Sequence, residues 1–157
     1  EHLEGESVAI VADGASHPNV TVVDGVVALE IQASVIHVGL SYTGWLETNE
    51  IEGGGINGTA QTKKKDVSAL GVRFLDTLYA KYGTDYYNLY QIEMRTAAMR
   101  MDRPPEIFTG DVKMQVLNNG GSIKESGWTR SKRAIICQDL PFPCNVQLII
   151  PYFRVSN

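Results

Sequence analysis

The sequence predicts an all-β domain, a mainly antiparallel β-sandwich or barrel-like fold with one long irregular loop and little helix. Short runs rich in valine and isoleucine recur along the chain, and several of them end at turn signals such as Asp13-Gly14 and Asp24-Gly25. The 157 residues are also the length of one ordinary domain with its own core. We therefore expect a single β-rich domain over residues 1–157.

The first third of the chain reads as strands separated by tight turns. Residues 7–12 are apolar and stop at Asp13-Gly14. Residues 20–31 place Asp24-Gly25 between two valine-rich runs. This is a hairpin signature, because a type I′ loop needs positive φ at both of its central residues. Further strands are expected over residues 34–42 and 45–51.

Residues 66–82 fit two patterns. Val67, Leu70, Phe74 and Leu78 fall at helical spacing behind Asp66, which could cap a helix. Leu70, Val72 and Phe74 also alternate as in a strand, and Gly71 would weaken a helix. The pattern by itself leans slightly to helix.

The region after Gly83 changes in character. Residues 83–111 contain clustered aromatics, methionines and a Pro-Pro pair without a sustained period, so we expect an extended loop with one short strand at 89–95. Such loops are usually functional or form interfaces. A second glycine-bearing loop follows at 118–132. The closing strands are expected at 111–117, 133–138 and 145–153.

The segment "IEGGGINGTAQTKKK" at 51–65 raises the question of a phosphate site. A P-loop would need Lys-Ser/Thr after Gly58, where Thr59-Ala60 stands. Gly53-x-Gly55-x-x-Gly58 matches the dinucleotide fingerprint, with Asp76 near the place of the ribose-binding acid, but that fingerprint needs a parallel βαβ unit. The surroundings read as antiparallel strands. We therefore interpret the segment as a glycine-rich crossing between strands.

Other candidate sites are weak. Lysines 63–65 could clamp an anion or simply end a solvated strand. His2, His17 and His37 show no metal-binding spacing, and we interpret them as two surface histidines and one on a strand. Cys137 and Cys144 could form a disulfide across a turn, but two ordinary thiols fit better. We assign no catalytic residue, metal ligand or cofactor site, and we expect no enzyme.

Two groups of side chains point to binding. Glu47, Glu50 and Glu52 form an acidic group in a turn region. A tyrosine group could form an interface, stack on sugar rings or pack its own loop, because tyrosine combines an apolar ring with a hydrogen-bonding end. The members of this group are Tyr82, Tyr86, Tyr87 and Tyr90.

Overall composition excludes several classes. The net charge of −4 and the pI near 5.3 show no basic footprint for nucleic acid over the whole chain. The longest apolar run is shorter than the roughly 18–20 residues that span a membrane, so no span is expected. The chain opens at Glu1 without methionine or a signal peptide. We expect it to be excised from a longer protein.

The order of several segments resembles the later part of the tail nozzle proteins, also called tail tubular protein B, of short-tailed bacteriophages. The resemblance runs from about His2 to Phe153, and the chain departs from the family pattern at 117–132 and in having Cys137 and Cys144. The segments that carry it are "HLEGESVAIVADGASHPN", "VIHVGLSYT", "EGGGINGTAQTKKKDVSALGVRFLDT", "MDRPPEIFTGD" and "QDLPFPCNVQLIIPYF".

The resemblance implies a non-enzymatic structural virion protein. Such a subunit would form a ring with copies of itself, contact other tail proteins such as the adaptor and fibre, and let DNA pass as cargo. It would be made in the bacterial host cytoplasm and reside in the phage tail. The resemblance also implies that residues 66–78 form a strand, against the helical lean.

Within that role we give two sets of residues a function. Glu47, Glu50 and Glu52 are a candidate channel-facing set, since acidic walls repel the DNA phosphates and so weaken holding. Loop 83–111 is a candidate for contacts with neighbouring subunits or a partner protein. Its residues in that role are Tyr86, Tyr87, Tyr90, Met99, Met101 and Phe108.

Two other readings stay open. A carbohydrate-binding β-sandwich module would use the tyrosines together with Trp45 and Trp128. A nucleotide-binding enzyme, the less favoured alternative, would use the glycine segment.

Overall fold

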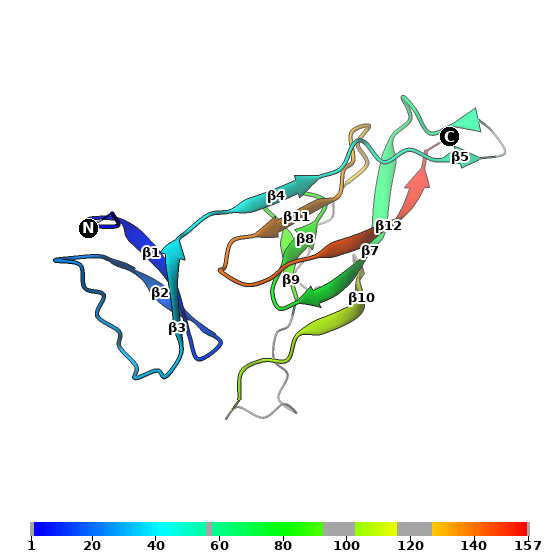
Figure 1. Ribbon diagram of the computed structural model, residues 1–157. Coiled ribbons are helices and arrows are strands. Elements are labelled where there is room, and N and C mark those ends of the chain that lie inside the picture. The colour runs from blue at the N-terminus through cyan, green and yellow to red at the C-terminus, as the bar shows by residue number, and fades with distance from the viewer. Residues whose placement is uncertain (1, 56–57, 93–102, 116–126, 157) are drawn as a thin grey trace.

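The protein is all-β, as the sequence predicts. A computed structural model describes residues 2–55, 58–92, 103–115 and 127–156, and these contain strands and turns but no helix (Figure 1). All strand pairs are antiparallel. The strands are β1 (Ser7–Ala12), β2 (Ala15–Thr21), β3 (Ile36–Leu40), β4 (Gly44–Glu47), β5 (Gly54–Gly55), β6 (Gly58–Thr59), β7 (Lys65–Thr77), β8 (Lys81–Gly83), β9 (Leu89–Gln91), β10 (Phe108–Gln115), β11 (Ile135–Gln138) and β12 (Val146–Val155).

The first 40 residues build a small sheet of order β2-β1-β3. Asp13 and Gly14 join β1 to β2 with φ of 48° and 77°, so the first turn signal is confirmed. Asp24 and Gly25, with φ of 53° and 71°, form the predicted two-residue turn, and Val23 and Val26 bridge antiparallel across it. The hairpin does not extend into two longer strands, since β2 already ends at Thr21.

The segment after β2 leaves the sheet because it covers the sheet's apolar face. Val22 is buried against Val8 and Ile10 of β1, and Val27 and Leu29 pack on the same cluster. The Glu4 carboxylate accepts the backbone N–H groups of the turn residues Asp24 and Gly25 at 2.8 Å each. The valine-rich run thus supplies packing instead of a strand ladder.

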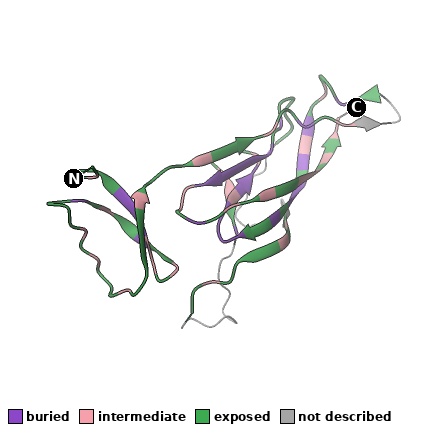
Figure 2. Cartoon of the chain, in the orientation of Figure 1, coloured by how far each residue is buried: buried purple, intermediate pink, exposed green. Residues whose placement is uncertain are grey.

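Strands β4 and β7 to β12 form a sandwich. One sheet has the order β10-β7-β12 and the other the order β4-β11-β8-β9. Leu70, Val72 and Phe74 of β7 are fully buried in the main core together with Tyr82 of β8 and Ala80, which precedes β8. In Figure 2 the buried segments concentrate in β1, β7, β8 and β11, while β3, β4 and β12 are largely exposed or intermediate.

The helix that the pattern slightly favours over residues 66–82 is wrong, and the strand that the resemblance implies over residues 66–78 is confirmed. β7 pairs with β10 on one side and β12 on the other over most of its length. Alternate residues Leu70, Val72 and Phe74 face the core, as the period of a strand requires. The helical spacing of the apolar residues was coincidental, because partners far along the chain decide the conformation.

The glycine segment forms a short antiparallel ribbon. Gly54 pairs with Thr59 and Gly55 pairs with Gly58. This agrees with a crossing between strands and contrasts with the parallel βαβ unit that a dinucleotide fold requires.

In region 83–111, residues 93–102 lie outside the described residues, and the described parts differ from the expected limits. A short strand does begin at Leu89, but it ends at Gln91, and β10 begins at Phe108, ahead of the expected position 111. β11 and β12 lie within two residues of the predicted limits.

The small sheet stands apart from the sandwich and is joined to it by residues 41–43 (Figure 1). A small apolar cluster of Leu78, Tyr79 and Phe142 in the sandwich also receives Val11 from β1. The two parts therefore touch through apolar side chains.

Candidate functional site

The most developed polar site lies where β4 and β8 end and β11 begins. Register places Glu47 of β4 opposite Ile135 of β11, and Ile135 opposite Gly83 of β8. The turn after Gly83 carries Tyr86, and Arg133 lies just before β11. Three segments far apart in sequence thus bring a carboxylate, a phenol and a guanidinium to one place.

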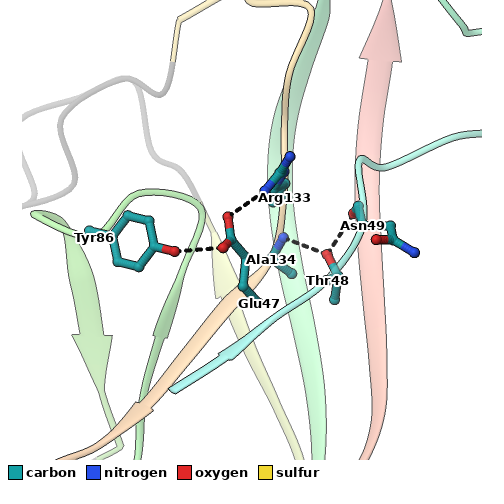
Figure 3. A network of polar contacts seen from close by, with 6 residues as sticks. All are labelled: Glu47, Thr48, Asn49, Tyr86, Arg133 and Ala134. Carbon is teal, nitrogen blue, oxygen red and sulfur yellow. Dashed lines mark hydrogen bonds and ion pairs between the residues drawn. The ribbon is translucent and has the colours of Figure 1, made fainter. Parts of the chain in front are cut away.

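Figure 3 shows how these groups interact. The Tyr86 hydroxyl donates to Glu47 Oε2 at 2.6 Å, and Arg133 Nη1 donates to Glu47 Oε1 at 3.0 Å. The hydrogen bond from Tyr86 and then that from Arg133 lower the pKa of Glu47 below its usual value. The carboxylate is therefore a fixed, ionised acceptor.

Neighbouring contacts hold this network in place. Thr48 Oγ1 accepts the backbone N–H of Ala134 at 3.0 Å and donates to the Asn49 carbonyl at 2.9 Å (Figure 3). The Trp45 and Tyr86 rings lie with centroids 5.4 Å apart and planes tilted by 60°. This aromatic contact orients the Tyr86 ring toward the carboxylate.

The turn that presents Tyr86 is built from local hydrogen bonds. The Asp85 side chain accepts the N–H of Tyr87 at 3.1 Å and the Asn88 amide at 3.0 Å. A Cβ on Gly83 would lie 2.7 Å from the Asn88 carbonyl oxygen, so only glycine permits this close return of the chain.

A hollow of about 600 Å³ opens beside the network. Aromatic rings and groups of both charges meet there, which suits a ligand or partner side chain with hydrogen-bonding groups around an apolar face. The side chains that give it this character are Glu47, Asp85, Tyr86, Trp128, Lys132 and Arg133.

The predicted tyrosine group divides in two. Tyr86, Tyr87 and Tyr90 lie on one exposed turn and strand, and Tyr87 is 94% exposed. Tyr82 is instead fully buried, with its ring edge-on to those of Phe74 and Tyr90. The packing alternative thus holds for Tyr82, and the Tyr90 ring packs on it. Contact of Tyr86, Tyr87 and Tyr90 with a partner stays a prediction.

The other described candidate of loop 83–111 lies in a different sheet. Phe108 opens β10 in the opposite sheet and is 36% exposed. Met99 and Met101 fall outside the described residues. The described part of the loop therefore offers two separate surfaces.

The acidic group is also divided. Glu47 is paired with Arg133, and Glu52 Oε1 lies 2.7 Å from Lys65 Nζ, whose side chain is only 1% exposed. Glu50 is exposed, and the described part of the chain gives it no ion pair. Two of the three carboxylates thus have local structural partners, and the channel-facing role stays a prediction.

The lysine run divides in the same way. Lys65 is buried against Glu52, so a clamp formed by all three lysines is wrong. Lys64 is exposed and Lys63 is partly exposed at the edge of the sandwich. The exposure of these two lysines agrees with the alternative that the run lies at a solvated strand end.

A second polar cluster carries no signal in the sequence. Lys81 of β8 forms an ion pair with Asp139, which follows β11. The hydrogen bond to Asp139 raises the pKa of Lys81. Burial by itself would raise the pKa of Asp139, but hydrogen bonds from Lys81 and Tyr79 hold it below its usual value. The pair stays charged and joins strand β8 to the loop after β11.

The cysteines and histidines have structural surroundings. Cys137 and Cys144 are free thiols, and burial raises the pKa of both. His17 is buried, which corrects the expected surface position: its Nδ1 lies 2.8 Å from the Pro18 carbonyl and its Nε2 accepts the Glu30 N–H at 3.2 Å. The described residues contain no cluster of three or more potential metal ligands.

Two comparisons with known proteins found no match. No protein-family model matches it, and no curated protein has a matching sequence. Within the described ranges, no helix has the length and apolar character needed to cross a membrane.

Proposed function

We propose that the chain is a structural domain of a phage tail nozzle, part of the ring through which DNA leaves the capsid, and that it acts by subunit assembly and not by catalysis. The proposal begins from the shared order of segments with the tail nozzle proteins. Other tail proteins would be further partners, and DNA would pass as cargo.

The observation that carries the proposal is the amount of apolar surface left open on strands. Val38 and Leu40 of β3 are 46% and 58% exposed, Trp45 of β4 is 51% exposed, and Leu148 of β12 is 45% exposed. Large exposed apolar patches mark interaction sites in folded proteins. An assembly subunit needs several such surfaces, because each copy contacts at least two neighbours.

Antibody labelling tests this role directly. Antibodies raised against the purified chain should mark the tail end of short-tailed particles in negative-stain electron microscopy. Labelling of the capsid, or of no particle in a lysate that contains the protein, would contradict it. Light scattering with and without ATP tests the nucleotide alternative, since binding to the glycine segment should change mass or stability.

A second candidate function is saccharide binding at the hollow beside Glu47. The specific observation is the combination of Tyr86 and Trp128 with the fixed carboxylate and Arg133 on its wall. Sugars present apolar ring faces and hydroxyls, and this lining offers groups for both. A tryptophan-fluorescence titration with mixed oligosaccharides should then saturate in the wild-type chain and not in Tyr86→Ala.

A further inference from the structure

The outer strand of the small sheet has an open apolar face. Ile36, Val38 and Leu40 of β3 are 45%, 46% and 58% exposed. Val38 lies opposite Ile10 and Leu40 lies opposite Val8 in the β1–β3 ladder. Opposed residues of antiparallel strands share a face. The β3 side chains therefore continue the face that buries Val8 and Ile10.

The cover over that face is incomplete. Val22, Val27 and Leu29 pack on Val8 and Ile10, but the β3 side chains remain exposed. β3 is also the last strand of its sheet, and no described strand pairs with its other edge. The strand, "IHVGL", has no lysine, glutamate or proline of the kind that protects edges from pairing.

The charge of the chain is divided between its two parts. Residues 1–62 contain nine acidic residues and no lysine or arginine, a net charge of −9. Residues 63–157 contain all 14 basic residues against nine acidic ones, a net charge of +5. The part of the chain that contains the small sheet thus carries only negative charges, and most of the sandwich strands belong to the part with a net positive charge. Two copies attract when the small sheet of one meets the sandwich of the other.

The sandwich offers a matching face on the outside of its β10-β7-β12 sheet. Leu148 and Tyr152 of β12 are 45% and 44% exposed there. Lys113 of β10 reaches across Gly71 of β7, and its Nζ lies 4.3 Å from the Tyr152 ring centroid. No carboxylate in the described part of the chain forms an ion pair with Lys113. The face therefore combines apolar surface with an available positive charge.

We infer that the open β3 face of one copy packs on the outer β10-β7-β12 face of a second copy. The two surfaces are different parts of the chain, so the contact is head-to-tail. It leaves the sandwich face free on one copy and the β3 face free on the other. Repetition of such a contact closes a ring or extends a filament. The inference rests on the proposed assembly role for the identity of the partner, and it names the surfaces that would meet.

A complementation experiment tests the pairing. Val38→Asp damages the β3 face and Leu148→Asp damages the sandwich face. Each variant by itself should associate at least about tenfold more weakly than the wild-type chain in sedimentation velocity, as loss of a central interface residue does. Mixed together they should form a one-to-one dimer, because each supplies the surface that the other has lost.

Matched controls separate the faces from general effects of a new charge. Val26→Asp changes an equally apolar residue of the acidic part that is 64% exposed, and Leu46→Asp changes a β4 residue that is 42% exposed. Both should associate like the wild-type chain. Association of the wild-type chain should weaken as sodium chloride is raised from about 50 to 500 mM, because opposite charges meet across the contact.

The outcomes distinguish the contact from the wider role. A mixture of the two variants that stays monomeric while the wild-type chain associates would overturn these surfaces and leave the assembly role standing. If Leu148→Asp associates like the wild-type chain while Val38→Asp does not, β3 pairs with a surface other than the β10-β7-β12 face. This result would also overturn the inferred contact. A wild-type chain that is monomeric at millimolar concentration would overturn the contact, while antibody labelling of particles would still decide the proposed function. Dimer formation in the mixture also shows that both variants are folded.

Discussion

The buried ion pair between Lys65 and Glu52 gives the sharpest test of the energetics. The Lys65 side chain is 1% exposed, Glu52 is 36% exposed, and the charged atoms are 2.7 Å apart. Breaking a fully buried pair costs about 3–5 kcal/mol, whereas exposed pairs contribute about 0–1 kcal/mol. Because water reaches the Glu52 carboxylate, we expect Glu52→Gln to cost about 2 kcal/mol, between these limits.

Lys65→Met should behave differently. Methionine removes the buried charge and keeps a side chain of similar length, so the free energy of unfolding should stay within about 1 kcal/mol of the wild-type value. Glu52→Gln in the Lys65→Met background should then cost little, because the ammonium that needed the carboxylate is gone.

Urea denaturation followed by tryptophan fluorescence measures these differences. With a slope of about 2 kcal/mol per molar urea, Glu52→Gln should lower the midpoint by about 1 M. Glu50→Gln is the matched control, since Glu50 is exposed and should leave the midpoint unchanged. The reasoning is refuted when Glu52→Gln unfolds within about 0.5 kcal/mol of the wild-type chain, or when Lys65→Met costs more than Glu52→Gln.

Three other predictions follow from the site and its surroundings. Tyr86 and Arg133 lower the pKa of Glu47 in the folded state, so the ionised Glu47 stabilises the fold above its unfolded pKa near 4.5, and this stabilisation is lost as pH falls through the folded pKa. Glu47→Gln should therefore be less stable than the wild-type chain at pH 7 and equally stable near pH 2, and a pH-independent difference in urea midpoint would contradict this. Gly83→Ala should cost about 1–3 kcal/mol in urea unfolding, since the new Cβ would meet a backbone oxygen at 2.7 Å, whereas Gly39→Ala, with nothing within 4 Å, should be tolerated. Cys144 should react with a thiol reagent faster than the buried Cys137 in the native state, and equal rates that match those in urea would argue against the packed β11.

The sequence predicted the fold class because its signals are local. Asp13-Gly14 and Asp24-Gly25 fix two turns through their positive φ, and this requirement can be read without knowing any distant partner. β7 shows where local signals fail. Its apolar residues satisfy helical and strand periods together, and pairing with β10 and β12 decides between them.

The site was predictable only in part. Tyr86 could be singled out as an exposed aromatic in a turn, and the structure places it there. Its network could not be found, since Glu47 at the end of β4 and Arg133 just before β11 lie far away in sequence with no shared motif. The Lys81–Asp139 pair is hidden for the same reason.

β4 pairs with β11, which lies far along the chain, and this separation sets an order of folding during synthesis. The small sheet draws all of its strands from residues 7–40, so it can form soon after this part of the chain leaves the ribosome. β4 has to wait for β11, because Glu47 pairs with Ile135. Until then Trp45 and Leu46 stay on an unpaired strand, next to a finished sheet. The Trp45–Tyr86 contact and the ion pair between Glu47 and Arg133 thus form late, and emission from Trp45 reports whether β11 has joined β4.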